Sequence, residues 1–314
     1  MGSQLAGPWR QFVNDLGESP ALDGPYENLM GGWTTLLGKL MSRYSFPPPD
    51  PSVQTEDIEV SGIRVRTYIP PDVVGPSVAL YLHGGGWVMG SVEEEDGFCR
   101  ALSKLSGTKI VSVAYRLAPE FPFPRPLEDC VLAAEWAMDT HPSQSVAVVG
   151  TSAGGNLAFS TALTLIEKGL GDRVQGVVGL APVTVHPDAV PVERKAQHTS
   201  YSENDRLTIN TGSAMMTFFD SYGAPPQHPQ LSCVLHPRLA ELNKVYMAVG
   251  GADTLRDDVR LMQSALTEAR VPVQCDEYSG YPHYSWLFPC PALKEHQGQF
   301  FGNLVRGVRW VFAR

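Results

Sequence analysis

The sequence predicts an α/β fold in which a mostly parallel, eight-stranded sheet is covered by helices on both faces. Short apolar segments alternate with amphipathic segments of helical periodicity from residue 78 to the C-terminus. The apolar segments are almost uninterrupted, which is typical of parallel strands buried on both sides. Only 18% of the 314 residues are charged, and glycine (30) and proline (26) are frequent. This composition indicates a loop-rich globular protein and excludes a disordered chain or a coiled coil.

The N-terminal part predicts helices followed by a hairpin. Within residues 1–46, apolar side chains recur at helical spacing in two stretches, and the run Phe46–Pro51 then ends the second helix as a stiff linker. The next two segments alternate between apolar and polar residues, with Ser61-Gly62 between them as the turn. Including this hairpin, the expected strands are Val53–Val60, Ile63–Ile69, Val78–Leu82, Lys109–Ala114, Ser145–Val149, Val174–Leu180, Val245–Val249 and Val273–Tyr278.

Helices are expected between the later strands and at the C-terminal end, and one segment interrupts the alternation. The expected helices are Leu127–Met138, Ala153–Lys168, Arg256–Arg270 and Glu295–Phe312. Residues 184–230 contain several prolines and no apolar strand of the earlier kind. We therefore expect this segment to be an insertion packed over the sheet.

Charge and cysteine usage exclude several classes of protein. The formal net charge is −9 and no Lys/Arg cluster is present, which argues against nucleic-acid binding. No apolar stretch is long enough to span a bilayer, and the N-terminal residues do not have the pattern of a signal peptide. The five cysteines are scattered without a C-x-x-C pair, so neither a disulfide framework nor a zinc site is expected. These observations predict a cytoplasmic protein.

The strongest chemical signal is a G-x-S-x-G sequence at Gly150–Gly154, centred on Ser152. It follows an expected strand and precedes an expected helix, which is the context of a nucleophile elbow. Small residues on both sides of the serine allow the sharp turn that exposes its hydroxyl, and the free amides at the start of the helix point to the same place. Ser152 is therefore the candidate nucleophile.

A second signal is the glycine loop His83-Gly84-Gly85-Gly86, which directly follows the expected strand Val78–Leu82. Backbone amides without a neighbouring Cβ can donate to a developing oxyanion, and H-G-G-G loops do so upstream of the nucleophile in esterases. A flexible turn or a phosphate-binding loop are the alternatives. A dinucleotide-binding G-x-G-x-x-G does not fit because Met89 stands where the third glycine should be, and no G-K-[ST] follows.

A serine nucleophile needs a base and a residue that orients the base. His283 lies just after the expected strand Val273–Tyr278, and Asp253 lies after Val245–Val249, which gives the order Ser, Asp, His of α/β hydrolases. Asp253 could also cap a helix, and Asp257 and Asp258 are interpreted as charges at a helix N-terminus. The remaining downstream histidines are expected to be exposed or capping: His186, His198, His228, His236 and His296.

Taken together, these motifs resemble the hormone-sensitive-lipase-like esterase family of the α/β-hydrolase fold. The resemblance runs from about Val53 to the C-terminus and includes Tyr115–Glu120 (Tyr-Arg-Leu-Ala-Pro-Glu) and Asp253–Asp257 (Asp-Thr-Leu-Arg-Asp). The stretch Pro282–Pro289 is similar to fungal members akin to versiconal hemiacetal acetate esterases. The resemblance implies Ser152 as nucleophile, His283 as base, Asp253 as orienting acid and the amides of Gly85, Gly86 and Ala153 as oxyanion donors.

The resemblance also implies a cap over the site, made from two segments. We expect a cap from residues 1–50 and 184–230, and a hydrolase body from residues 51–183 and 231–314. The sequence departs from the family pattern at Thr254 (usually proline), Thr151 (commonly aspartate) and Tyr284 (commonly glycine). None of these departures removes a catalytic atom. The expected substrate pocket comprises Trp87, Tyr284, Trp286, Met215 and Phe219.

The predicted function is a serine carboxylesterase that acts on a short-acyl ester of an apolar or aromatic compound, with no cofactor and no metal. The expected partner is a small-molecule ester, without nucleic acid or a membrane span, and a homodimer is compatible with the sequence. The alternative is a biosynthetic cyclase or lyase that uses the same groups for ring closure or elimination. A binding module is disfavoured because receptors that resemble this family tend to lose the histidine, whereas His283 is present. Amidase and thioesterase activity differ only in the leaving group and stay open.

Overall fold

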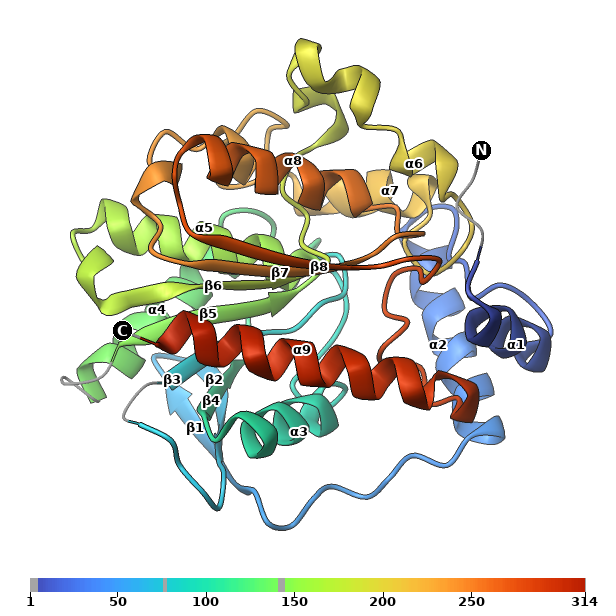
Figure 1. Ribbon diagram of the computed structural model, residues 1–314, viewed down its shortest axis with the longest axis horizontal. Coiled ribbons are helices and arrows are strands. Elements are labelled where there is room, and N and C mark those ends of the chain that lie inside the picture. Colours follow the sequence, from blue (N-terminus) through green and yellow to red (C-terminus); the bar gives the residue numbers. More distant parts are fainter. Residues whose placement is uncertain (1–4, 76–77, 141–144, 314) are drawn as a thin grey trace.

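The computed structural model describes residues 5–75, 78–140 and 145–313 and contains one eight-stranded sheet (Figure 1). The strand order is β1-β2-β4-β3-β5-β6-β7-β8, and every pair from β4 to β8 is parallel, while β1 and β2 are antiparallel. The predicted sheet is therefore confirmed. The strands are β1 (Gln54–Val60), β2 (Ile63–Ile69), β3 (Val78–Leu82), β4 (Lys109–Val113), β5 (Val146–Thr151), β6 (Val174–Leu180), β7 (Val245–Gly250) and β8 (Val273–Tyr278).

Helices cover both faces of the sheet, which explains why its central strands are uniformly apolar. On one face α3 (Asp96–Ser106) packs beside α9 (Lys294–Phe312). The other face carries α4 (Arg125–Thr140), α5 (Ala153–Glu167) and α8 (Arg256–Glu268). Helix α5 is buried almost throughout, and the small residues of its first turns allow it to lie close to β3, β5 and β6.

Wherever a range was predicted for a strand or helix, its boundaries agree with the structure to within about two residues. Helix α3 was not predicted, and neither were the two helices of the β6–β7 connection, α6 (Ser200–Glu203) and α7 (Gly212–Tyr222). Strand β1 was predicted from alternation, but it lies at the edge of the sheet, and all its residues except Ile58 and Val60 are exposed. Short 3₁₀ turns complete the connections: η1 (Gly171–Arg173), η2 (Pro187–Ala189), η3 (Val192–Gln197), η4 (Cys233–Leu235), η5 (Leu239–Glu241) and η6 (Pro291–Leu293).

Two segments distant in sequence lie next to each other near the carboxyl ends of the strands. They are the N-terminal helices α1 (Gly7–Leu16) and α2 (Tyr26–Arg43) and the connection from β6 to β7, which holds α6 (Ser200–Glu203) and α7 (Gly212–Tyr222). Helix α2 packs on α7. Residues 1–4 of the expected N-terminal cap segment lie outside the described residues.

The loop between α1 and α2 is fastened to the β6–β7 connection by a set of polar contacts. Three side-chain hydroxyls donate to backbone carbonyl oxygens across the two segments, and one exposed ion pair joins them. These contacts are Ser19 Oγ to Arg206 O (2.8 Å), Thr211 Oγ1 to Leu22 O (2.6 Å), Thr217 Oγ1 to Gly24 O (3.0 Å) and the pair Arg206–Asp23. Among the described residues, no helix is long and apolar enough to cross a membrane.

Candidate active site

Ser152 occupies the turn between β5 and α5. Its backbone has φ 56° and ψ −118°, a conformation that L-residues rarely adopt and that the surrounding structure must enforce. The glycines of the motif are required by space. A Cβ at Gly150 would overlap the carbonyl of Gly154, and a Cβ at Gly154 would overlap the carbonyl oxygens of Leu82 and His83. The turn at Ser152 is therefore held directly against the end of β3.

The glycine loop His83–Gly86 follows β3, and Tyr115 holds its first residue in place. The Tyr115 hydroxyl donates to the carbonyl oxygen of His83 (2.7 Å), and the two rings stack with centroids 4.2 Å apart. His83 Nδ1 donates to the carbonyl of Gly84 (2.8 Å). Burial lowers the pKa of His83 to about 4, so the ring is neutral at neutral pH. His83 therefore shapes the loop and is not a proton carrier.

The next two residues of the loop keep their amides free. Gly85 and Gly86 have φ 115° and 61°, and within the described part of the chain neither backbone N–H has a hydrogen-bond acceptor. A Cβ at Gly86 would overlap the ring of Phe218 from α7, so this helix packs directly on the loop. Two unpaired donors beside the serine turn can bind an oxyanion.

Asp253 and His283 lie together after β7 and β8. His283 Nδ1 donates to Asp253 Oδ2 (2.7 Å), and both side chains are almost fully buried. Among the described residues, His283 Nε2 has no hydrogen-bond partner although it is buried. Because a buried polar atom without a partner is costly, this free nitrogen indicates a place where another group binds.

Three buried residues of the β6–β7 connection hold this pair, and sequence reasoning missed them. Asn210 Nδ2 donates to Asp253 Oδ1 (3.0 Å), which also accepts from the backbone N–H of Leu255 (2.9 Å). Asn204 Nδ2 donates to the Asp253 carbonyl (2.8 Å), and Thr208 Oγ1 donates to the His283 carbonyl (3.1 Å). No motif marks these positions, because the contacts cross more than 40 residues of chain.

The five expected pocket residues are all buried. Trp87 stacks on Tyr222 of α7 (4.5 Å between centroids) and contacts Phe219 (5.7 Å). Tyr284 lies edge-on to the His283 ring (4.7 Å). Trp286 stacks on Phe300 of α9 (4.4 Å), which is a core contact, and Met215 is 1% exposed.

The expectation of an exposed or capping side chain was wrong for His198 and for His296. The His198 side chain is 7% exposed and its Nε2 lies 2.8 Å from Asp258 Oδ1. His296 is buried, hydrogen-bonded to Ser285 (3.0 Å) and stacked on Tyr281 (3.6 Å), because α9 turns this face toward the loop after β8. Burial lowers the pKa of His296 to about 4. Asp257 and Asp258 do lie in the first turn of α8, as expected, but both are buried.

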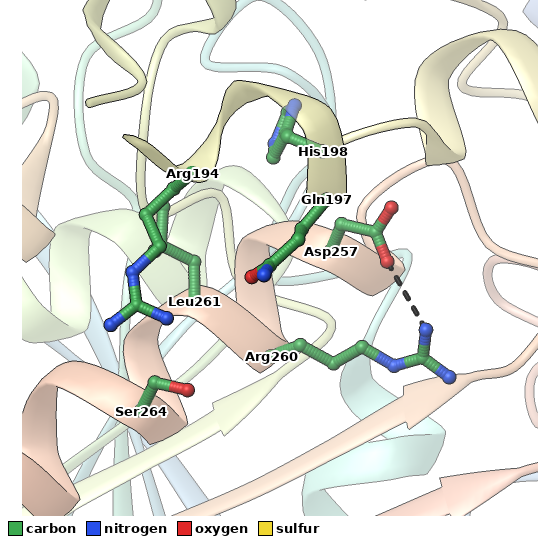
Figure 2. Close-up of a pocket in the computed structure, with 7 residues that line it drawn as sticks. All are labelled: Arg194, Gln197, His198, Asp257, Arg260, Leu261 and Ser264. Carbon is green, nitrogen blue, oxygen red and sulfur yellow. Dashed lines mark hydrogen bonds and ion pairs between the residues drawn. The ribbon is translucent and has the colours of Figure 1, made fainter. Parts of the chain in front are cut away.

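A cavity of about 270 Å³ lies between the β6–β7 connection and α8, and none of the expected site residues lines it (Figure 2). Its two arginines are both paired: Arg194 with Glu268, and Arg260 with Glu277 and Asp257. We therefore assign no chemistry to it. The lining residues are Arg194, Gln197, His198, Asp257, Arg260, Leu261 and Ser264.

A sheet of this order, with a serine turn after β5, a glycine loop after β3 and a His–Asp pair after β7 and β8, is the architecture of an α/β hydrolase. The family model of the alpha/beta hydrolase fold matches residues 79–287. The chain therefore belongs to the α/β-hydrolase family, and the resemblance to hormone-sensitive-lipase-like esterases is confirmed.

Two curated fungal relatives are similar over nearly their whole length. The versiconal hemiacetal acetate esterase of Emericella nidulans is 66% identical over 90% of this chain and 99% of its own. The enzyme of the same description from Aspergillus parasiticus is 53% identical over 99% and 100%. The crystal structure of vibralactone cyclase has a TM-score of 0.84 at 25% identity, covering 99% of this chain and 95% of its own. The chain is thus a carboxylic ester hydrolase of this family.

Proposed function

We propose that this protein is a serine carboxylesterase that removes a short acyl group from an apolar or aromatic secondary metabolite. The proposal depends most on one observation: His283 is bound to Asp253 through Nδ1 and carries a buried, unpaired Nε2. An imidazole in that state is a proton acceptor with a fixed tautomer, which is what a serine nucleophile requires.

The proposed reaction proceeds in two halves. Nε2 of His283 accepts the hydroxyl proton of Ser152 while the serine oxygen bonds to the ester carbonyl carbon. The amides of Gly85, Gly86 and Ala153 stabilise the resulting oxyanion, and Asp253 stabilises the imidazolium. The carbon–oxygen bond to the alcohol then breaks, and the alcohol leaves with the proton from His283. Water repeats the sequence on the acyl-enzyme and releases the acid.

The substrate class is proposed from the relatives and from the residues above the glycine loop. The relatives are described as esterases of a hemiacetal acetate, and we propose an acetate-sized acyl group here. The ring of Phe218 stands over Gly86, so little space is left beside the proposed oxyanion donors. Trp87, Phe219 and Tyr284 would give the alcohol part an aromatic environment.

We further propose that residues 1–50 and 184–230 form a cap over residues 51–183 and 231–314. The polar contacts between Ser19–Gly24 and the β6–β7 connection support a cap made from both segments. A cytoplasmic location is part of the proposal because the cysteines are free thiols, four of the five being buried. Homodimerisation stays a prediction.

The experiment that tests the proposal is labelling with a fluorophosphonate probe followed by peptide mass spectrometry. Wild-type protein should be labelled at Ser152, and Ser152→Ala should be unlabelled and should lose hydrolysis of p-nitrophenyl acetate. Labelling at another residue, or hydrolysis that survives Ser152→Ala, would refute the assignment.

The second candidate is ring closure or elimination by the same groups, which the likeness to vibralactone cyclase supports. Product masses separate the two functions with a candidate pathway ester. Hydrolysis adds one water across the ester, whereas ring closure or elimination gives products without that oxygen. Release of the free acid together with the alcohol, whose mass is one water above that of the elimination product, would exclude ring closure and elimination.

A further inference from the structure

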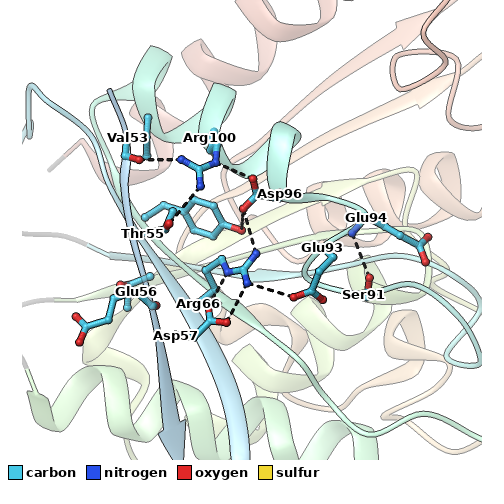
Figure 3. Close-up of polar contacts among 12 residues, drawn as sticks. Val53, Thr55, Glu56, Asp57, Arg66, Ser91, Glu93, Glu94, Asp96 and Arg100 are labelled. Carbon is cyan, nitrogen blue, oxygen red and sulfur yellow. Dashed lines mark hydrogen bonds and ion pairs between the residues drawn. The ribbon is translucent and has the colours of Figure 1, made fainter. Parts of the chain in front are cut away.

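A buried carboxyl group contacts the glycine loop and has no part in the proposed reaction. Glu95 precedes α3 and is 8% exposed. Its neighbours in the acidic run Glu93–Asp96 behave differently (Figure 3). Glu93 and Asp96 both pair with Arg66 near the edge strands, and Glu94 is exposed. Of these four acidic residues, Glu95 is the one that is buried.

Glu95 contacts the glycine loop and residues beside both proposed catalytic groups. Its Oε1 accepts from the backbone N–H of Gly84 (3.0 Å). Its Oε2 accepts from the Tyr81 hydroxyl, whose oxygen is 3.0 Å from Thr151 Oγ1, and Thr151 directly precedes Ser152. The hydroxyl of Tyr284, the residue after His283, also hydrogen-bonds to this carboxylate and fills the space that a Cβ at Gly84 would need.

The two ends of this network are Thr151, which precedes Ser152, and Tyr284, which follows His283. With aspartate at 151, a second carboxylate would lie near Glu95 without a countercharge, which is unfavourable in a buried site. With glycine at 284, the carboxylate would lose one donor. Thr151 and Tyr284 are therefore both compatible with a buried carboxylate at Glu95.

We propose that Glu95 is a positioning residue for the reaction, whose carboxylate fixes the glycine loop relative to the segments that carry Ser152 and His283. The inference depends on the proposed serine esterase mechanism. By holding the Gly84 amide, Glu95 sets the direction of the following amides of Gly85 and Gly86, which must be aimed within a few tenths of an ångström to stabilise an oxyanion. Glu95 does not touch the substrate, so substrate binding is not affected directly.

The test compares kcat and KM of Glu95→Ala and Glu95→Gln with p-nitrophenyl acetate. Glu95→Ala removes the acceptor of the Gly84 amide and of the Tyr81 and Tyr284 hydroxyls. We expect kcat to fall about 10- to 100-fold, less than the 10²–10³ of a lost oxyanion donor, with KM within about threefold. Glu95→Gln retains an oxygen that can accept from Gly84, so it should recover at least about tenfold of the loss. Equal loss in both variants, or a change confined to KM, would overturn the proposal.

A matched control separates positioning from stability. Asp276→Ala also removes a carboxylate that accepts from a tyrosine hydroxyl, that of Tyr246 (2.8 Å), on β8 away from the glycine loop. It should leave kcat unchanged at equal folded fraction by circular dichroism. If Glu95→Ala does not fold, Tyr81→Phe removes only the hydroxyl between Glu95 and Thr151 and should lower kcat about threefold at constant KM. An unchanged kcat in Tyr81→Phe would overturn the proposal in that case.

Fluorophosphonate labelling distinguishes failure of this inference from failure of the proposed function. Wild-type protein labelled at Ser152 together with an equal labelling rate in Glu95→Ala would refute the positioning role alone. Wild-type protein without label at Ser152 would refute the serine esterase mechanism, and the role of Glu95 with it. Slower labelling of Glu95→Ala with partial recovery in Glu95→Gln would support both.

Discussion

Asn210→Ala is expected to weaken catalysis through a hydrogen bond that the β6–β7 connection supplies to the proposed acid. Asn210 Nδ2 donates to Asp253 Oδ1 (3.0 Å) in a buried site. The variant leaves Asp253 with the Leu255 amide on the same oxygen and His283 on the other. The carboxylate therefore keeps its contact with the base but loses one of the groups that fix its orientation.

The magnitude follows from the kind of hydrogen bond removed. A hydrogen bond to a charged group contributes about 1.5–3 kcal/mol, and we take the lower value because Leu255 still donates to the same oxygen. About 1.4 kcal/mol corresponds to a factor of ten in rate. We therefore expect kcat to fall about tenfold with little change in KM, since Asp253 acts on the base and not on the substrate.

Steady-state kinetics with p-nitrophenyl acetate measure this effect, with two companion variants. Asn243→Ala removes a different asparagine, whose side-chain amide donates to the carbonyl oxygen of Val174 at the start of β6, and it should leave kcat unchanged at equal folded fraction. Asn210→Asp places a second carboxylate beside Asp253 and should cost more than Asn210→Ala, because like charges in a buried site disfavour ionisation. An Asn210→Ala enzyme with wild-type kcat would refute the argument that the β6–β7 connection stabilises the acid.

Three further predictions concern space, charge and the serine turn. Phe218→Ala clears the ring from Gly86, so kcat/KM for p-nitrophenyl hexanoate relative to the acetate should rise about tenfold; a constant ratio would show that this ring does not limit the acyl group. Burial raises the pKa of Glu95 to about 7, so between pH 4.5 and 7 the carboxyl is protonated in the folded state and ionised in the unfolded state. The stabilisation of the folded state by this proton is therefore full below about pH 4.5 and is lost as the pH rises to 7. The unfolding free energy of wild-type protein relative to Glu95→Gln, from urea titrations, should fall by about 3 kcal/mol between pH 4.5 and 8, and a flat difference would contradict the raised pKa. Gly154→Ala should abolish activity and lower Tm, because the added Cβ would overlap the carbonyl oxygens of Leu82 and His83 at the end of β3. Gly38→Ala, at an exposed position of α2 where an added Cβ meets nothing within 4 Å, should raise Tm slightly.

The other titratable groups around Glu95 do not change charge in that pH range in a way that differs between the two proteins. The tyrosines and the thiol that face it have pKa values raised far above 7 by burial, so they stay neutral throughout. Glu94 is the other carboxyl near it, and its pKa is also raised; it is present in both proteins that are compared. These groups are Tyr81, Tyr115, Tyr284, Cys99 and Glu94.

The sequence alone was informative where local pattern decides structure. The limits of β2, β3, β6 and β8 were predicted to the residue, because continuous or alternating apolar runs bounded by glycine, proline or polar residues have few alternatives. The glycine loop and the serine turn were recognisable because backbone geometry demands glycine at Gly150 and Gly154. The proximity of Asp253 and His283 followed from the rule that the carboxyl ends of parallel strands share one edge.

Contacts between distant segments could not be predicted in the same way. Asn210 reaches Asp253 from an irregular connection in which no periodicity fixes the direction of a side chain. Glu95 stands in a run of four acidic residues, a pattern typical of a solvated surface, and only the path of the chain turns it inward. His296 was misjudged for a related reason, since the sequence does not say which face of α9 meets the loop after β8.

The fastening of the Ser19–Gly24 loop to the β6–β7 connection has a practical consequence for anyone making shortened versions of this protein. A version that starts after Gly24 would lack the carbonyl oxygens that accept from Thr211 and Thr217. Thr211 also caps α7 through the amide of Ala214, and α7 carries the ring that lies on Gly86. Removing the first 24 residues would therefore loosen α7, the helix that packs on the glycine loop.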